Sequence, residues 1–307
     1  MKHEPAERLT ISVIIPHLNQ ADALVLCLSA LAKGIRQPDQ VIVVDNGSAE
    51  LPKHVHDVFP NALLLVEPCP GPGLARNTGV MRASGQVLAF IDADCIPDHR
   101  WLLAAEGRLL QGGPCILGGD VRITYADADT PDALECYESI FAYRMDRYIA
   151  RAGFTGAGNM IVTRDAFNRV GPFKGRDIAE DRDWGQRAAS AGFLTRYCPD
   201  VRVYHPARRS FADLCRKWDR QLAHDFAECH GIAKRLMWAA KAIMLAFSPV
   251  WAAFRVLGSD RISGPRSRIL AAGILLRIRC YRAFRMLQFS GGLNPDQLLG
   301  RWNEADA

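Results

Sequence analysis

VLAFIDAD, residues 87–94, is the stretch of sequence that decides the fold. Its five leading apolar residues have the composition of a strand buried on both faces, which is typical of parallel sheets. Open α/β sheets bind ligands in the crevice beyond the carboxyl ends of such strands. Two carboxylates one residue apart repel each other unless a cation lies beside them, and Mg²⁺ or Mn²⁺ prefers oxygen ligands of this kind. The stretch therefore predicts a metal-bound diphosphate at the end of a buried strand, although D-x-D also occurs in exposed turns.

Strand-like and helix-like patterns alternate on the N-terminal side of this stretch. Ile11 to Ile15 and Gln40 to Val44 are β-branched runs, and Asp22 to Lys33 between them has leucines at helical spacing. Asn61 to Val66 and Leu74 to Ala83 repeat the order of strand and helix. This alternation requires a parallel sheet with right-handed crossovers. Neither G-x-G-x-x-G nor G-K-[ST] occurs, so we expect a nucleotide to be held through carboxylates and a metal ion.

Five short motifs, taken in order, resemble the family 2 glycosyltransferases of the GT-A fold. They are PHLN (16–19), VVDNGS (43–48), GLARNTG (73–79), DAD (92–94) and ED (180–181). The resemblance covers roughly residues 9–205 and implies a Rossmann-like mixed sheet in a catalytic domain, 1–207. The donor half of that domain would span about 9–123 and the acceptor half about 124–207.

The resemblance implies a nucleoside-diphosphate sugar donor, with a UDP-sugar favoured. Asp45 and Arg76 would contact the nucleobase side, although Asp45 could instead cap a turn and Arg76 could be an exposed helix residue. Asp94 would bind Mg²⁺ or Mn²⁺ on the diphosphate, where a cation stabilises the charge of the leaving group. His205, directly after the run Val201 to Tyr204, is either a second metal ligand or a plain loop or core histidine. The donor-binding residues implied are Pro16, Asn19, Asp45, Arg76, Asp92 and Ala93.

A glycine-containing turn and an acidic helix start should supply the acceptor side. The turn GAGN, 156–159, precedes a short apolar run, Met160 to Thr163, and a helix is predicted over Asp177 to Ala191. Carboxylates in a first helical turn are also favoured by the helix dipole alone. The resemblance makes Asp181 the general base for the acceptor hydroxyl, so that direct displacement inverts the anomeric configuration. The acceptor-side residues implied are Gly158, Asn159, Glu180 and Trp184.

Two other functions compete with this interpretation. A nucleotidyltransferase would need a basic, glycine-rich phosphate loop after the first strand, and Pro16 to Asp22 contains neither glycine nor Lys or Arg. An inactive sugar-nucleotide-binding membrane scaffold is the non-enzymatic alternative, and the joint presence of Asp92, Asp94 and Asp181 argues against it. The Q-x-x-R-W signature of processive relatives does not occur, so we expect one sugar to be added per encounter.

The composition suits an intracellular catalytic domain with an extension. The chain has 307 residues with 49% hydrophobic content, which is enough for a substantial core. The nine cysteines show no C-x-x-C spacing, and Met1 to Thr10 lacks a signal-peptide core. Both features favour a reducing cytosolic setting, where nucleotide sugars are available.

The C-terminal part of the sequence is both the most basic and the most apolar. Residues 231–290 contain eleven Lys or Arg and one acidic residue, Asp260. Leu236 to Leu257 and Ile269 to Phe289 are predicted helices of membrane-spanning length, joined by a turn-rich connector, Gly258 to Arg268. Their charges make spanning costly, and a two-span hairpin would place the basic connector on the far side, against the positive-inside tendency.

We therefore expect a helical, membrane-associating extension that lies on the cytoplasmic face of the plasma (inner) membrane as a peripheral or monotopic anchor. Residues 208–230, including a helix over Phe211 to His230, would connect the catalytic domain to the tail, 231–307. A packed helical subdomain or a dimer partner is the alternative. Nucleic acid is a poorer partner, because the basic residues alternate with a wide apolar face. The acceptor, possibly lipid-linked, would belong to cell-surface glycan or glycolipid assembly.

Overall fold

The computed structural model describes residues 8–112, 115–175, 179–227, 229 and 231–294. These residues form two compact units: a sheet unit, made of residues up to 122 and 143–206, and a helical unit, made of 123–142 and 207 onwards. The expected acceptor half, 124–207, is thus divided between the two. Residues 1–7 and 295–307, and the positions of Asp177 and His230 in the predicted helices, lie outside the described residues.

Strands β1 (Ile11–His17), β2 (Gln40–Asp45), β3 (Leu63–Val66) and β4 (Val87–Ile91) form the parallel half of the sheet. The predicted alternation of strands and helices over this part of the chain is confirmed. β1 runs two residues beyond the prediction. The strand continues through Pro16, which pairs with Val44, and His17, whose carbonyl accepts from the Asn46 backbone N–H at 2.8 Å.

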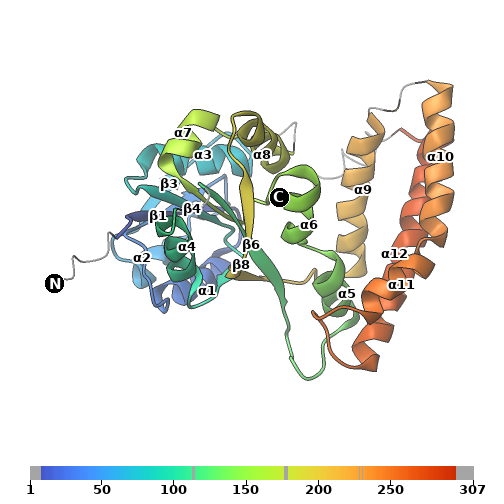
Figure 1. Cartoon of the computed structure of the whole chain (residues 1–307), viewed down its shortest axis with the longest axis horizontal. Helices are drawn as coiled ribbons and strands as arrows, with labels where there is room; N and C mark the ends of the chain where they lie inside the picture. Colours follow the sequence, from blue (N-terminus) through green and yellow to red (C-terminus); the bar gives the residue numbers. More distant parts are fainter. Residues whose placement is uncertain (1–7, 113–114, 176–178, 228, 230, 295–307) are drawn as a thin grey trace. The chain divides into compact units, whose positions relative to one another are not determined.

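The other half of the sheet runs antiparallel, which makes the sheet mixed (Figure 1). β7 (Asn159–Thr163) lies antiparallel to β4 on one side and to β6 (Ile116–Thr124) on the other. β8 (Thr195–Pro206) pairs with the short β5 (Ile96–Pro97). Among the described residues the strand order is β3-β2-β1-β4-β7-β6-β8-β5. β7 therefore joins the parallel half of the sheet to the remaining strands.

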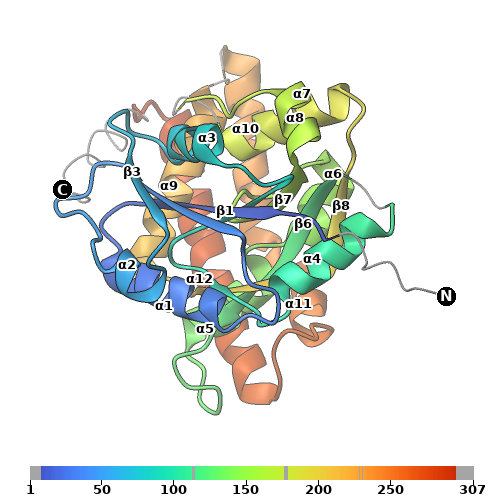
Figure 2. The ribbon, with the colours of Figure 1, turned by 90° about the vertical axis from the view of Figure 1, so that its left-hand side faces the viewer.

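Helices cover both faces of this sheet (Figure 2). On one face, α1 (Ala21–Ala32) and α4 (Trp101–Leu110) bury their apolar residues against the strands. On the other face lie α3 (Pro72–Arg82), α7 (Arg164–Val170) and α8 (Glu180–Ser190), around a cluster of Phe and Trp rings. The sheet unit also contains α2 (Val55–Val58) and α6 (Met145–Ala152). Burial of both faces explains why the central strands β2 and β4 are continuous apolar runs.

One asparagine ties together the antiparallel strands. Asn159, at the start of β7, donates through Nδ2 to the carbonyls of Asp120 on β6 and Val201 on β8, at 2.9 and 3.0 Å. Its Oδ1 accepts from Trp101 Nε1 at 2.9 Å. A Cβ at Gly119 would fall 2.1 Å from Asn159 Nδ2, so this strand contact requires glycine there. The amide of Asn159 is therefore buried and fully used within the sheet.

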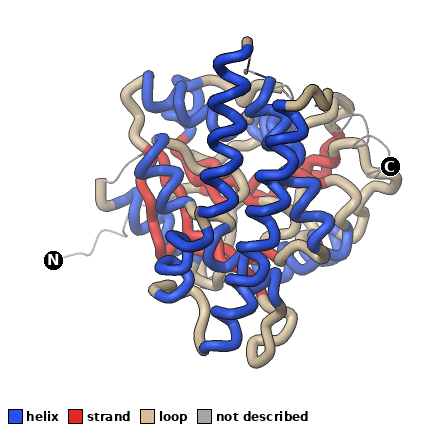
Figure 3. The backbone as a smooth tube through the Cα atoms, turned by 90° about the vertical axis from the view of Figure 1, so that its right-hand side faces the viewer, coloured by secondary structure: helices blue, strands red, loops and turns tan. Residues whose placement is uncertain are grey.

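The helical unit contains α5 (Ala133–Phe141), α9 (Phe211–Ala227), α10 (Ile232–Phe247), α11 (Pro249–Leu257) and α12 (Pro265–Ser290). Figure 3 shows its long helices as blue tubes. α12 packs against each of the other four helices. Apolar residues of α5, α9, α11 and α12 form one of its cores, and those of α9, α10 and α12 form another.

The predicted helices of the tail have different ends in the structure. The helix expected over Leu236 to Leu257 is two helices, α10 and α11, which break at Ser248 before Pro249 and bend by 45°. Proline cannot donate the backbone hydrogen bond that would continue α10. By length and composition, this bent pair passes a test for a membrane span, whereas no single described helix does. α12 begins at Pro265, so Arg266 and Arg268 belong to a helix and not to the connector.

Several basic residues of the tail are used inside the helical unit. The Arg282 guanidinium lies 3.4 Å from the centre of the Trp218 ring, and that of Arg277 lies 3.9 Å from the centre of the Phe211 ring. Arg285 pairs with Asp219 at 3.3 Å. Cation–π contacts of this kind stabilise helix packing. The basic excess of the tail is therefore partly a packing feature.

Candidate active site

The D-x-D carboxylates follow β4 at the carboxyl end of the parallel strands. A tight turn forms there, because the backbone N–H of Cys95 donates to the Asp92 carbonyl at 3.0 Å. Ala93 is buried, while the side chains of Asp92 and Asp94 are 37% and 22% exposed. The turn therefore presents two carboxylates to solvent from a rigid, buried strand.

A buried arginine links this turn to the acidic start of α8. Arg76, on α3, donates to Asp92 Oδ1 at 2.6 Å and to Glu180 Oε1 at 3.4 Å, and it is only 4% exposed. Burial alone would lower the pKa of Arg76, but Asp92 and Asp181 raise it above its usual value. The side chain is a buried partner of carboxylates and not the exposed helix residue that the pattern also allowed.

Asp181, at the start of α8, has a pKa close to neutral pH. Burial raises its pKa to about 7; Arg76 opposes the shift, and Glu180 and Asp92 add to it. Its Oδ1 is buried without a hydrogen-bond partner among the described residues. A carboxylate with a pKa near neutrality is matched to accepting a proton from a hydroxyl group. The geometry and the shift therefore make Asp181 a candidate general base.

The GAGN turn closes around these carboxylates. A Cβ at Gly158 would lie only 2.3 Å from Asp92 Oδ2, and one at Gly156 would lie 3.7 Å from Asp181 Oδ2. Glycine at 158 therefore permits the close approach of the turn to Asp92. Trp184 lies in the core, where its Nε1 donates to the Gly171 carbonyl at 2.9 Å. Of the expected acceptor-side residues, Gly158 and Glu180 adjoin the cluster, whereas Asn159 and Trp184 are buried in packing.

Asp94 and His205 face each other in an arrangement that suits a cation. His205 Nδ1 lies 2.6 Å from the Pro206 carbonyl, to which it donates, so in the neutral ring Nε2 carries a lone pair. That Nε2 lies 3.3 Å from Asp94 Oδ2, and Tyr143 Oη lies 3.1 Å from it. Burial raises the pKa of Asp94; His205 opposes this shift when its ring is protonated, and Asp92 adds to it. Two electron-pair donors facing each other at this distance fit a divalent ion, and Cys95 lies close to both.

Near the ends of β1 and β2, a buried histidine that the sequence interpretation missed holds Asp45 in place. The Gln20 backbone N–H donates to His17 Nε2, so the proton of the neutral ring is on Nδ1. His17 Nδ1 therefore donates to Asp45 Oδ1 at 2.9 Å. The Gly47 and Ser48 N–H groups donate to Asp45 Oδ2 at 3.2 and 3.0 Å. Burial opposes ionisation of Asp45, but bonds from Ser48 and His17 hold its pKa below the usual value.

Two other predicted donor residues adjoin the loop that follows β2. Pro16 lies in β1 opposite Val44. Asn19 Oδ1 accepts from the Ala49 backbone at 2.9 Å, and the Asn19 backbone N–H donates to Ser48 Oγ at 2.8 Å. Asp45 and Asn19 therefore shape the loop through their own hydrogen bonds. The PHLN motif contained His17, but its burial follows from the β1–β2 register and not from any local pattern.

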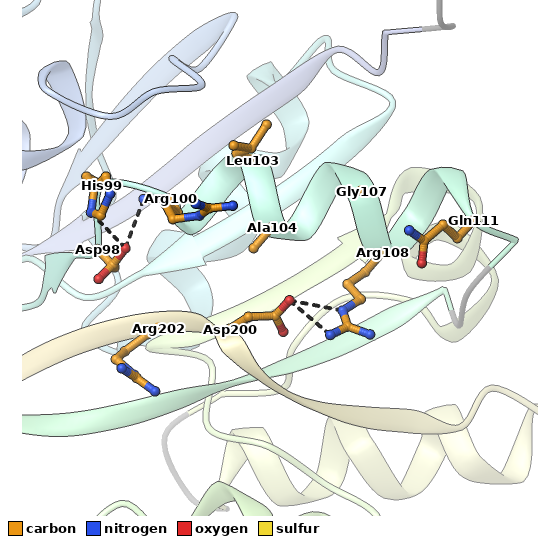
Figure 4. Close-up of a pocket in the computed structure, with 10 residues that line it drawn as sticks. All are labelled: Asp98, His99, Arg100, Leu103, Ala104, Gly107, Arg108, Gln111, Asp200 and Arg202. Carbon is orange, nitrogen blue, oxygen red and sulfur yellow. Dashed lines mark hydrogen bonds and ion pairs between the residues drawn. The ribbon is translucent and has the colours of Figure 1, made fainter.

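A separate groove of about 610 Å³ lies along α4 and β8 (Figure 4). Its close-up shows Arg108 reaching across to Asp200, at 3.0 Å. None of the residues predicted for catalysis or donor binding lines it. The carboxylates that line the groove, Asp98 and Asp200, are paired with His99 and Arg108, so we place the candidate active site at the strand-end cluster.

The mixed sheet, with carboxylates at the end of β4 and a further carboxylate at the start of α8, has the arrangement of the GT-A fold. Solved structures agree on the fold. A mannosyltransferase from Pyrobaculum calidifontis, in complex with GDP-Man and Mn²⁺, matches with a TM-score of 0.55 and 20% identity, covering 97% of this chain and 80% of that one. S. aureus TarS 1–349, in complex with UDP-GlcNAc, matches with a TM-score of 0.54 and 16% identity, covering 94% and 78%.

The chain belongs to glycosyl transferase family 2, whose model matches residues 12–171. A second model, glycosyl transferase family group 2, matches residues 114–282. Glycosyltransferase AglE of Haloferax volcanii is 34% identical over 215 residues, which are 67% of this chain and 70% of that protein. The N-acetylglucosaminyl-diphospho-decaprenol L-rhamnosyltransferase of Mycobacterium tuberculosis is 27% identical over 229 residues, 62% of this chain and 72% of that protein.

Proposed function

We propose that this glycosyltransferase moves one sugar from a nucleoside-diphosphate donor, with a UDP-sugar favoured, to a hydroxyl acceptor with inversion. The observation that carries the proposal is the network in which Arg76 joins Asp92 to Glu180, beside Asp181. It lies where open α/β sheets bind ligands. Two fold neighbours, solved with GDP-Man and with UDP-GlcNAc, support a nucleotide-sugar donor.

In the proposed reaction, Asp181 takes the proton of the acceptor hydroxyl as its oxygen attacks the anomeric carbon. A single displacement forms the new bond opposite the departing diphosphate, which inverts that carbon. Asp94 and His205 would hold Mg²⁺ or Mn²⁺, which would supply charge stabilisation to the diphosphate. Arg76 keeps its carboxylate neighbours in place and ionisable, so it is a positioning residue in this scheme. Without a covalent intermediate, no protein nucleophile is needed.

The donor would lie across the carboxyl ends of β1, β2 and β4. Asp92 and Ala93 adjoin the ribose, and the loop shaped by Asp45 and Asn19 borders the nucleobase beside Pro16. Gly158 allows the GAGN turn to approach Asp92 beside the donor, and Glu180 borders the acceptor. Asn159 and Trp184 support this arrangement from the core, where they are buried.

We further propose that the helical unit binds the cytoplasmic face of the plasma (inner) membrane as a peripheral or monotopic anchor. α10 and α11 expose a row of large apolar side chains, with Trp251 and Phe254 at 72% and 76% exposure. Exposed basic residues accompany them, among them Lys234, Lys241 and Arg255. An apolar face bordered by cations complements anionic headgroups. A lipid-linked acceptor would place the reaction in cell-surface glycan or glycolipid assembly, and the name of the rhamnosyltransferase relative describes a lipid diphosphate.

Titration calorimetry with UDP-, GDP-, TDP- and CMP-sugars, with and without Mn²⁺, tests the donor site. We expect one donor to bind in the presence of Mn²⁺ and to lose at least tenfold in affinity in Asp94→Asn. Asp127→Asn is a matched control, because Asp127 is an exposed carboxylate of the helical unit. No binding to folded protein across the panel would contradict the proposal. Donor binding without transfer to any acceptor would instead favour the scaffold function.

A further inference from the structure

The candidate cation site has a third possible protein ligand. Cys95 follows Asp94 directly and is 2% exposed. Its Sγ lies within 4.8 Å of the ligand atoms of Asp94 and His205. Its sulfur accepts a hydrogen bond from the Asp92 backbone and keeps a further electron pair for a cation. Oxygen, nitrogen and sulfur donors therefore surround one point.

A second buried thiol near the same turn shows that proximity alone does not produce this arrangement. Cys27, on α1, is fully buried, and its Sγ lies 3.9 Å from the Asp92 carbonyl oxygen, to which it donates weakly. It does not belong to the group of potential ligands. Cys27 is thus a small apolar core residue with a backbone contact. Among the cysteines in the described part of the chain, only Cys95 joins the Asp94–His205 pair, which makes Cys27 a matched control.

The donor set bears on which cation the site prefers. Mg²⁺ takes oxygen ligands almost exclusively, whereas Co²⁺, Zn²⁺ and Cd²⁺ accept thiolate and imidazole readily. With metal bonds of about 2.0–2.3 Å, ligand atoms around a tetrahedral ion stand roughly 3.5 Å apart. Asp94 and His205 already have this spacing, and Sγ reaches it by a shift on the order of 1 Å. On coordination, the metal replaces the thiol proton, which passes to solvent.

We propose that Cys95 is a third protein ligand of this cation site and that it makes the site selective for thiophilic divalent ions over Mg²⁺. This inference rests on the proposed function only for the place of the cation. Asp94 and His205 supply the oxygen and nitrogen donors, and the thiolate sets the preference. Zn²⁺ at low concentration then competes with Mg²⁺ or Mn²⁺ for the site.

Absorption spectroscopy of the full-length protein with Co²⁺ tests the sulfur ligand directly, without any measurement of activity. Wild type should show a near-ultraviolet thiolate-to-cobalt charge-transfer band together with visible d–d bands. Cys27→Ser should keep the charge-transfer band, and Cys95→Ser should lose it while still binding Co²⁺. Competition experiments should show Cys95→Ser to bind Cd²⁺ at least tenfold more weakly, with Mg²⁺ affinity changed less than twofold. Circular dichroism verifies that each variant is folded.

The outcomes separate this inference from the proposed function. Visible d–d bands that vanish in Asp94→Asn, without any charge-transfer band in wild type, would overturn the role of Cys95 and leave the metal site standing. A charge-transfer band that persists in Cys95→Ser would also overturn it, because another thiol would be the ligand. No Co²⁺ binding to folded wild type would overturn both the sulfur ligand and the proposed metal site.

Discussion

Replacing Asp181 by asparagine should stabilise the protein while it abolishes sugar transfer. The carboxylate has a pKa raised from 3.8 to about 7 by burial, so its ionisation opposes folding at neutral pH. Between these two pKa values the folded state binds a proton that the unfolded state has released. Stability of the wild type therefore falls as the pH rises from about 4 to 7 and levels off above that range. Asparagine has nearly the same shape and carries no charge.

The size of the effect follows from the shift. Roughly three pKa units correspond to about 4 kcal/mol of unfavourable free energy for the ionised carboxylate. The variant does not gain this whole amount, because Arg76 loses one of the carboxylates that stabilise its charge. The raised pKa of Arg76 in the wild type reflects that stabilisation. We expect a net stabilisation of about 1–3 kcal/mol above pH 7, which corresponds to roughly 2–6 °C in Tm.

Thermal unfolding of both proteins in EDTA, from pH 5 to pH 8.5, measures this difference. The advantage of Asp181→Asn in Tm should increase up to about pH 7 and then remain constant. Asp183→Asn is the matched control two residues along α8, because Lys174 and Arg187 lower the pKa of that carboxylate despite some opposing burial. The control should destabilise the protein. A Tm difference for Asp181→Asn that is negative, or independent of pH, would refute the reasoning.

Three further outcomes are expected. For the wild type, kcat/KM should rise about tenfold per pH unit and level off above about pH 7, where the buried carboxylate is ionised; a flat profile would contradict its role as base. Gly158→Ala would place a methyl group 2.3 Å from Asp92 Oδ2 and should weaken donor binding at least tenfold, whereas Gly107→Ala, where a Cβ meets nothing within 4 Å, should leave it unchanged. The pair Trp251→Asp and Phe254→Asp should abolish sedimentation with anionic vesicles, and retained sedimentation would exclude this face as the anchor.

The parallel half of the fold could be predicted from local patterns, because each strand there is a short continuous apolar run. β4 has the predicted bounds, Val87–Ile91. β6 was not predicted, since Gly118 and Gly119 interrupt its apolar pattern. Those glycines are required by tertiary contacts: a Cβ at 118 would lie 2.7 Å from Thr155 Oγ1, and one at 119 would meet Asn159. No local pattern contains that information.

In the candidate site, too, local patterns predicted some features and tertiary contacts determine the others. D-x-D after a buried strand indicated where a ligand binds, and the ordered motifs named the carboxylates. The raised pKa of Asp181 could not be predicted, because it comes from burial by several elements, to which the charges of Glu180 and Asp92 add although Arg76 opposes the shift. The burial of Asn159 and Trp184 was equally hidden, because both residues belong to stretches that a functional motif also covers.

The contact between Gly119 and Asn159 has an evolutionary consequence. Asparagine at 159 serves three partners only while its neighbour on β6 lacks a side chain, and any residue larger than glycine at 119 would displace the amide. Neither position can drift alone without leaving buried backbone carbonyls unpaired. Across related sequences, the two positions should change together or not at all. A Gly–Asn pair at these positions should therefore identify the same strand junction even in relatives of low overall sequence identity.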